Sequence, residues 1–149
     1  MPKMYVLEGN PIPWARAGFN KNTLYIYDRQ KEERIQAKLN LENQHGNLPL
    51  YRGNLALFVT FYLPTPKSLS PKKRVAMEDT FHHSRPDLDN LLKWVGDIST
   101  EVLFNDDALV AIISARKLYS INPRTSFTIL ELSNEHTDNY LKENTQKTT

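Results

Sequence analysis

The apolar run at residues 55–63, LALFVTFYL, constrains the fold more than any other segment of the chain. Aliphatic, β-branched and aromatic residues follow one another almost without interruption, and Pro64 and Pro66 come directly after them. A short run of this kind, ended by prolines, predicts a strand rather than a helix. Because both faces of such a strand are apolar, we expect it to lie at the centre of a sheet with both faces buried.

Two strands and a helix are expected before this run, and two helices and two strands after it. The predicted strands are 4–7, 24–27, 109–118 and 126–132, the predicted helices are 28–44, 71–77 and 86–102, and residues 11–22 are predicted to form a loop. Ser70 and Pro71 indicate the start of a helix, since serine is a favoured N-cap and proline a favoured first helical residue. Residues 121–124 (INPR) predict a hairpin turn. This order predicts an α+β (two-layer α/β) fold, in which a mixed β-sheet packs against helices.

The chain has 149 residues and no cysteine, so its length is that of one domain, without disulfides or cysteine-bound metals. No apolar run approaches the roughly 18 residues of a membrane span. Residues 1–14 lack the apolar stretch of a signal peptide. We therefore expect a cytoplasmic protein with a single domain at residues 1–132 and a polar C-terminal tail at residues 133–149.

The charges are unevenly distributed along the chain. Six acidic residues and one basic residue lie between positions 87 and 107, whereas four basic residues and no acid lie between positions 67 and 74. Two interpretations fit this pattern. The first is an acidic helix face beside an unrelated basic loop, and the second is a surface that binds a polyanion around an acidic, metal-loaded site.

The predicted helix at residues 86–102 has two distinct faces. At about 3.6 residues per turn, one arc is apolar and is expected to pack on the sheet. This arc contains Leu88, Leu91, Leu92, Val95, Ile98 and Val102. The opposite arc carries Asn90, Lys93, Asp97 and Glu101, with Asp89 at its edge and Asp87 at the helix entrance.

Helix capping explains the first acids when each is taken alone. Ser84 and Asp87 have capping-box-like spacing. Asp89 lies one turn before Lys93, at the spacing of a helical ion pair. Acids in the first turn of a helix also interact favourably with the helix dipole.

A third carboxylate changes this interpretation. Asp106 and Asp107 suit a turn on their own, but a strand that begins at Asp107 beside the helix brings a further carboxylate near Asp87 and Asp89. Converging carboxylates are stable only when protonated or when they hold a divalent cation. Hard oxygen ligands select Mg²⁺ or Mn²⁺. The combination predicts a metal site, with Lys93 beside it to contact a phosphate.

Five segments together resemble a known family. They are GNPIPWARAGF (9–19), PTPKSLSPKKR (64–74), RPDLDNLLKWVGD (85–97), LFNDDALV (103–110) and ARKLY followed by NPRTSFTILEL (115–132). They resemble the N-terminal loop, lysine-rich stretch, D-x-D-N-x-x-K motif, paired aspartates and closing hairpin of the RusA-type Holliday junction resolvases. These are small endonucleases of bacteria and their phages. The resemblance covers about residues 3–132 and implies a RusA-like fold.

The resemblance implies a homodimer, associated with the nucleoid, that cuts four-way DNA junctions with paired nicks. It implies Mg²⁺ or Mn²⁺ and no organic cofactor. Asp87, Asp89 and Asp107 match the family's metal-binding catalytic carboxylates, and Lys93 matches its essential lysine. Asp106, their neighbour, is a further candidate metal ligand.

Basic side chains elsewhere are expected to contact DNA backbone phosphates, and such contacts carry no sequence readout. The candidates are Arg16, Lys67, Lys72, Lys73, Arg74, Arg116 and Lys117. Arg16-Ala17-Gly18 stands where many members of the family have Arg-Pro-Arg, so one basic contact is missing. Trp14 either stacks on an unpaired base at the junction centre or packs within its Pro-rich loop.

Three other functions stay open at this point. The chain is a metal-dependent nuclease that acts on other branched DNA, a DNA-architectural binding protein without catalysis, or an unrelated protein whose acidic helix is only structural. A binding protein would tolerate alanine at the aspartate positions and would gain nothing from metal. A metal-dependent nuclease requires both the aspartates and the metal.

Overall fold

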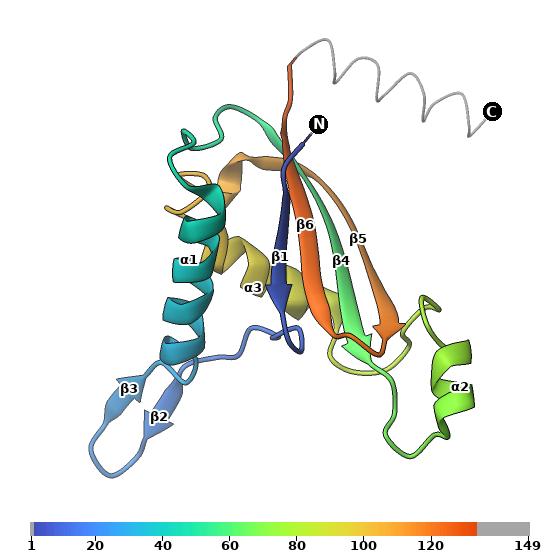
Figure 1. Cartoon of the computed structure of the whole chain (residues 1–149). Coiled ribbons are helices and arrows are strands. Elements are labelled where there is room, and N and C mark those ends of the chain that lie inside the picture. The colour runs from blue at the N-terminus through green and yellow to red at the C-terminus, as the bar shows by residue number, and fades with distance from the viewer. Residues whose placement is uncertain (1, 134–149) are drawn as a thin grey trace, which may run out of the picture.

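A four-stranded mixed sheet forms the centre of the fold in the computed structural model, which describes residues 2–133 (Figure 1). Its strands are β1 (Met4–Glu8), β4 (Leu55–Pro64), β5 (Val110–Ser120) and β6 (Arg124–Glu131), arranged in the order β1-β6-β4-β5. β4 is parallel to β5 and antiparallel to β6, and β6 is antiparallel to β1. The predicted α+β fold with a mixed sheet is confirmed.

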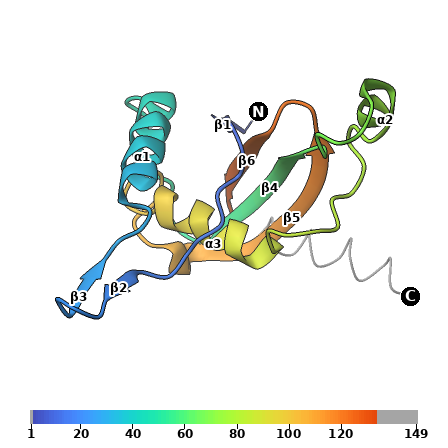
Figure 2. The ribbon, with the colours of Figure 1, turned by 90° about the horizontal axis from the view of Figure 1, so that it is seen from below.

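Three helices accompany the sheet: α1 (Lys31–His45), α2 (Pro71–Ala76) and α3 (Leu88–Ser99), and a 3₁₀ turn, η1 (Asp107–Leu109), precedes β5. α1 and α3 cover one face of the sheet, whereas α2 stands apart beyond the end of β4 (Figure 1, Figure 2). Ser70 caps α2 as predicted, because its Oγ accepts a hydrogen bond from the backbone N–H of Lys73 at 3.4 Å.

β4 lies at the centre of the sheet as predicted, but only one of its faces is buried. Leu57, Val59 and Phe61 point into the core, together with apolar side chains of β6, α1 and α3. On the other face Phe58 is 38% exposed and Thr60 is half-buried. The prediction of burial on both faces is therefore wrong, because the two packed helices lie on the same side of the sheet.

The last two strands do not form the predicted hairpin. β5 and β6 follow each other in the chain, but β4 lies between them and pairs with both. The turn at residues 121–124 therefore carries the chain across the end of β4. Each of its flanking strands finds its hydrogen-bond partners on β4, so a turn motif between two strands did not imply that they pair.

The apolar stripe of α3 packs into the core. Leu91, Val95 and Ile98 are buried as predicted, and Trp94 joins them at the edge of the stripe. The helix ends at Ser99, so Val102 is buried from the turn that follows rather than from the helix.

A small hairpin interrupts the predicted N-terminal loop. β2 (Gly18–Asn20) pairs antiparallel with β3 (Tyr25–Tyr27). A Cβ atom at Gly18 would lie 2.2 Å from Cζ of Tyr27, so a larger residue there would displace this exposed ring. The ring of Tyr27 thus lies across the backbone of the opposite strand.

The predicted polar tail at residues 133–149 falls almost wholly outside the described residues. Among residues 2–133, no helix has the length and apolar character needed to cross a membrane.

Candidate active site

The start of α3 does not form the predicted capping box. Asp87 is the N-cap residue by its backbone geometry, but its side chain accepts no capping hydrogen bond. The hydroxyl of Ser84 lies 3.3 Å from Nε2 of His82 instead. The carboxylate of Asp89 accepts a hydrogen bond from the backbone N–H of Asn90. The exposed Asp87 carboxylate is therefore not used in holding the first turn.

Asp107 lies against the middle of α3. A Cβ atom placed on Gly96 would be 3.7 Å from Oδ2 of Asp107 and 3.8 Å from its Cβ. Gly96 follows Asp89 by about two helical turns, so Asp107 faces a later turn of the helix than the sequence indicated. The glycine leaves room for this carboxylate beside the helix.

Asp89, Lys93 and Asp107 line one cavity of about 250 Å³ between α3 and the start of β5. Apolar side chains of the core and of β5 form its other walls, among them Leu57 and Ile113. Asp87 is not among the lining residues. The structure thus brings together three of the four predicted catalytic residues and leaves Asp87 at the helix entrance.

The electrostatics around Asp107 are those of clustered carboxylates. Partial burial raises the pKa of Asp107, and a hydrogen bond to the Asp106 carboxyl and the negative charges of Asp106 and Asp97 raise it further. The backbone N–H of Ala108 opposes this effect. Asp106 itself caps the turn η1, since its Oδ1 accepts a hydrogen bond from Ala108 N at 2.9 Å.

Asp97 is held by a basic residue of α1. Arg34 Nε donates to Asp97 Oδ2 at 2.7 Å, and the same guanidinium also forms an ion pair with Asp28. Burial alone would lower the pKa of Arg34, but hydrogen bonds and charge interactions with Asp97 and Asp28 outweigh it and raise this pKa. Sequence reasoning missed this tie, because residues 34 and 97 belong to different helices.

Lys93 is placed by an aromatic ring. Its Nζ lies 3.6 Å from the ring centroid of Trp14, a cation–π arrangement. The predicted ion pair with Asp89 is not formed. The backbone N–H of Trp14 donates to the carbonyl of Asn90 at 2.9 Å, and the half-buried indole packs against the core. The indole thus packs against the fold and also lies against the lysine, while stacking of Trp14 on a base stays a prediction.

The donor chemistry of the cavity fits a divalent cation, although its side chains do not form a complete coordination site. Among residues 2–133, no group of three or more His, Asp and Glu side chains is arranged to hold a metal ion. Asp89 and Asp107 nevertheless offer hard oxygen ligands. Burial raises the pKa of Asp107, the charges of Asp106 and Asp97 raise it further, and a bound cation would oppose this effect.

Lys117 is used inside the protein. Its Nζ donates to the carbonyl oxygens of Ser84 and Pro86 at 2.8 and 2.9 Å. The segment that leads into Asp87 is thereby tied to β5, and the backbone N–H of His82 also donates to the carbonyl of Lys117. The sequence placed Lys117 among the DNA contacts, whereas the structure shows two of its ammonium protons committed to internal carbonyls.

The other basic candidates do not share one surface. Arg116 donates from Nε to Thr60 Oγ1 on the face of the sheet that α3 does not cover. Arg74 donates to Thr65 beside α2. α3 lies between the β2–β3 hairpin, which follows Arg16, and α2, which carries Lys72 and Lys73 together with Arg74 (Figure 1, Figure 2). The hairpin and α2 thus lie on opposite sides of α3 (Figure 1, Figure 2), and Arg116 lies on the face of the sheet that α3 does not cover.

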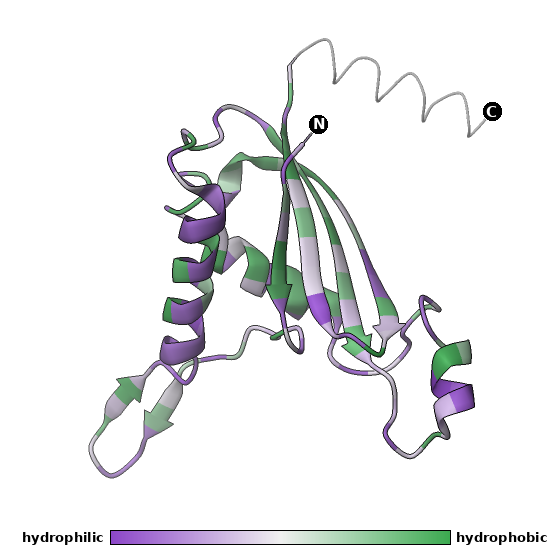
Figure 3. Cartoon of the chain, viewed as in Figure 1, coloured by the Kyte–Doolittle hydropathy of each residue, from purple (hydrophilic) through white to green (hydrophobic). Residues whose placement is uncertain are grey.

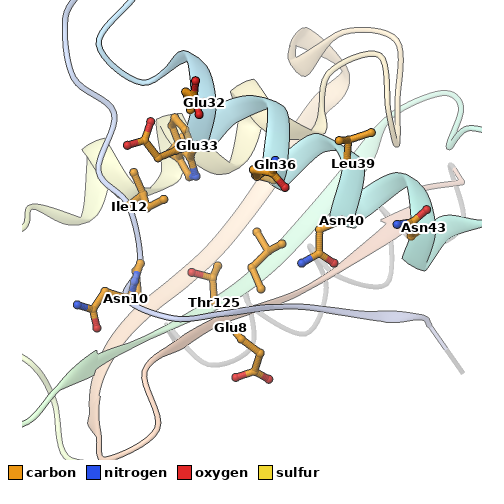
Figure 4. A pocket seen from close by; sticks show the side chains of 14 residues that line it. Glu8, Asn10, Ile12, Glu32, Glu33, Gln36, Leu39, Asn40, Asn43 and Thr125 are labelled. Atoms are coloured by element: carbon orange, nitrogen blue, oxygen red, sulfur yellow. The ribbon is translucent and has the colours of Figure 1, made fainter.

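A larger cavity of about 710 Å³ lies between α1, β1 and the N-terminal loop (Figure 4). Its polar lining comes mainly from carboxylates and amides, including Glu8, Glu32, Glu33 and Gln36, and no lysine or arginine among residues 2–133 lines it. This charge disfavours a phosphate, so the cavity is not a candidate for the nucleic-acid site.

Comparisons with known proteins agree with the geometry. A family model described as endodeoxyribonuclease RusA matches residues 8–130. A protein of Bacillus subtilis (strain 168) described as uncharacterized protein YqaN is 29% identical over 136 residues, which is 87% of this chain and 96% of that protein. The matched span contains the cavity, the helix α3 and the β2–β3 hairpin.

Proposed function

The chain belongs to the RusA endodeoxyribonuclease family, and from this premise we propose that it resolves four-way DNA junctions by paired, metal-dependent hydrolysis of phosphodiester bonds in DNA recombination and repair. The observation that supports the proposal most is the meeting of Asp89, Lys93 and Asp107 in one cavity. Two carboxylates and an ammonium are the groups that hydrolysis of a phosphodiester requires: ligands for a cation and a positive charge for the phosphate.

Asp89 and Asp107 would hold Mg²⁺ or Mn²⁺ in this proposal, and Asp87 and Asp106 would supply further ligands. When bound, the ion activates water and neutralises charge on the scissile phosphate. Lys93 contacts a phosphate oxygen and stabilises the charge that develops there. Trp14 holds the ammonium of Lys93 through the 3.6 Å cation–π contact.

Basic residues on both sides of α3 bind backbone phosphates of the junction arms. Arg16 lies on the hairpin side, and Lys67, Lys72, Lys73 and Arg74 lie on the α2 side. Contacts to phosphates select for the course of the backbone and not for sequence, which suits an enzyme that recognises a branched shape.

A homodimer supplies the two active sites that paired nicks need. Each protomer contributes one cavity with its own Asp89, Lys93 and Asp107. The two cuts then fall on two strands of the same junction.

A matched set of asparagine variants tests the site. A labelled four-way junction and a linear duplex are incubated with Mg²⁺ and with wild type, Asp89→Asn, Asp107→Asn and the control Asp79→Asn. The control makes the same chemical change at an exposed aspartate outside the cavity, and its backbone at φ 61° is one that asparagine tolerates. We expect nicking of the junction alone, lost in the first two variants and retained in the control.

Wild-type rates in Asp89→Asn and Asp107→Asn would show that the site assignment is wrong. Junction binding without any nicking by the wild type, and without an effect of metal, would favour the architectural DNA-binding protein instead. A panel of flaps, forks and three-way junctions then separates a junction resolvase from a nuclease for other branched DNA.

A further inference from the structure

The hairpin formed by β2 and β3 projects from the body of the fold (Figure 1) and is rich in hydrophobic residues (Figure 3). Phe19 and Ile26 are opposite each other in the strand register, and Tyr25 and Tyr27 belong to the other face because side chains alternate along a strand. Leu24 stands at the turn before β3. These five side chains are between 41% and 76% exposed.

Exposed apolar side chains on both faces limit the kind of surface that the hairpin can bind. A hairpin that lies on a protein surface has one apolar face and one polar face. Apolar side chains on both faces fit insertion between two apolar surfaces. The centre of a branched DNA offers such surfaces, because the base stack is interrupted there and terminal bases expose their π-faces.

The tip of the hairpin carries a side chain that the fold alone does not favour. Leu24 has φ 56°, in the left-handed region, and it is 76% exposed. Glycine or asparagine adopts this conformation more readily, and an exposed leucine gains no burial in return. Asn20 builds the turn by accepting hydrogen bonds from the N–H groups of Asn22 and Thr23. The strained apolar residue on an ordered turn points to a contact outside the domain.

The base of the hairpin is fixed relative to α3. The side chain of Gln30 accepts a hydrogen bond from Ala15 N at 3.0 Å and donates one to Pro13 O at 2.8 Å, so it ties the two ends of the hairpin together. Trp14, between Pro13 and Ala15, donates a backbone hydrogen bond to the carbonyl of Asn90 on α3. The position of the hairpin is thus coupled to the helix that carries the candidate active site.

The charges around the hairpin complement a polyanion. Arg16, Lys21 and Arg29 lie in or beside it. The nearby acid, Asp28, is paired with Arg34. Basic side chains interleaved with exposed aromatic ones are the combination that binds backbone phosphates while rings stack on bases.

We propose that the hairpin at residues 18–27 is a wedge that inserts at the centre of branched DNA and stacks on the nucleobases exposed there. This proposal rests on the proposed function, since it concerns the same substrate. Stacking of one base on one aromatic side chain changes affinity by about 5- to 150-fold. The hairpin therefore supplies preference for a branch point over a linear duplex.

Fluorescence of a base analogue tests the wedge directly. A four-way junction with 2-aminopurine at the branch nucleotide is titrated with full-length protein in the absence of divalent cations. Binding to the junction and to a linear duplex is measured in parallel. The variants are Tyr25→Ala and Leu24→Asn, and Tyr25→Phe is the control that keeps the ring.

We expect Tyr25→Ala to lower junction affinity at least 5-fold, with little change for the duplex and loss of the 2-aminopurine response, while Tyr25→Phe behaves like wild type. Leu24→Asn should weaken junction binding while its melting temperature stays equal to or above that of wild type, because asparagine relieves the strain. Unchanged junction preference in both variants overturns the proposal. The proposal is also overturned if the variants change the sedimentation coefficient of the protein and leave its junction affinity unchanged, because the hairpin then contacts a second copy of the chain.

Nicking by the wild type with Mg²⁺ separates this proposal from the proposed function. If the wild type nicks junctions and the variants keep their junction preference, only the wedge is wrong. If the 2-aminopurine response depends on Tyr25 and Leu24 but the wild type does not nick, the wedge stands and the nuclease assignment fails.

Discussion

Replacement of Lys117 by methionine distinguishes an internal tie from a DNA contact. The variant keeps the aliphatic stem and removes the ammonium that donates to the carbonyls of Ser84 and Pro86. Hydrogen bonds to a charged group contribute about 1.5–3 kcal/mol each when well buried. Because one bond is exposed and the other only partly buried, we discount both below this range and expect about 2 kcal/mol of lost stability for the pair. For a domain of this size that lowers the melting temperature by about 6–8 °C.

The Lys117→Met substitution should lower the nicking rate rather than the affinity for DNA. The lost bonds loosen the segment that delivers Asp87, and a displacement of about 1 Å at a reacting group costs on the order of 100-fold in rate. We expect single-turnover nicking of a four-way junction to slow by about 10- to 100-fold. The salt dependence of junction binding should be unchanged, because no phosphate contact is lost.

Lys72→Met is the matched control for this experiment. A lysine that contacts a phosphate contributes about 0.9 to the slope of log affinity against log salt concentration. Lys72→Met should therefore reduce this slope by up to about 0.9 and leave the melting temperature within a degree or two of wild type. The internal role of Lys117 is refuted if Lys117→Met reduces the salt slope like the control and leaves both stability and nicking rate unchanged.

Three further predictions concern the surroundings of the cavity. Trp14→Leu removes a cation–π contact worth about 0.5–1 kcal/mol. Single-turnover nicking should therefore slow by about 2- to 5-fold, while junction affinity changes little. A wild-type rate in this variant would show that the ring does not position Lys93. Gly96→Ala adds a methyl group at ordinary contact distance from Asp107 and should stabilise the helix by about 0.5–1 kcal/mol in urea unfolding, with nicking retained, whereas Gly96→Val should displace the carboxylate and slow nicking. Burial, with the charges of Lys117 and His83, lowers the pKa of His82 from 6.5. The unfolded chain therefore binds the proton more readily, and the free energy of unfolding falls as pH drops below about 6.5. In urea unfolding between pH 7 and 5, His82→Gln should show a smaller fall in this free energy than wild type. An equal fall in that variant would exclude His82 as its cause.

The sequence by itself determined the helices and the strands of the main sheet, but not β2, and it determined which side of α3 faces the core. The apolar run at 55–63 became the central strand, in which Leu57, Val59 and Phe61 are buried against the helices. The 3.6-residue period placed Leu91, Val95 and Ile98 on the core side of α3 and left Lys93 and Asp97 on the other side. Within one helix or strand, the direction of a side chain follows from its position in the sequence, so these assignments needed no tertiary information.

Only the tertiary structure decided which residues of different elements meet. Asp107 lies against Gly96, Lys93 lies over Trp14, and Lys117 reaches the carbonyl of Pro86. Each of these contacts depends on how the sheet and α3 pack, and a period along one segment contains no information on the angle or offset between two segments. The same reason explains the errors: strand periodicity did not show that both packed helices cover one face, and a turn motif did not show that β4 separates β5 from β6.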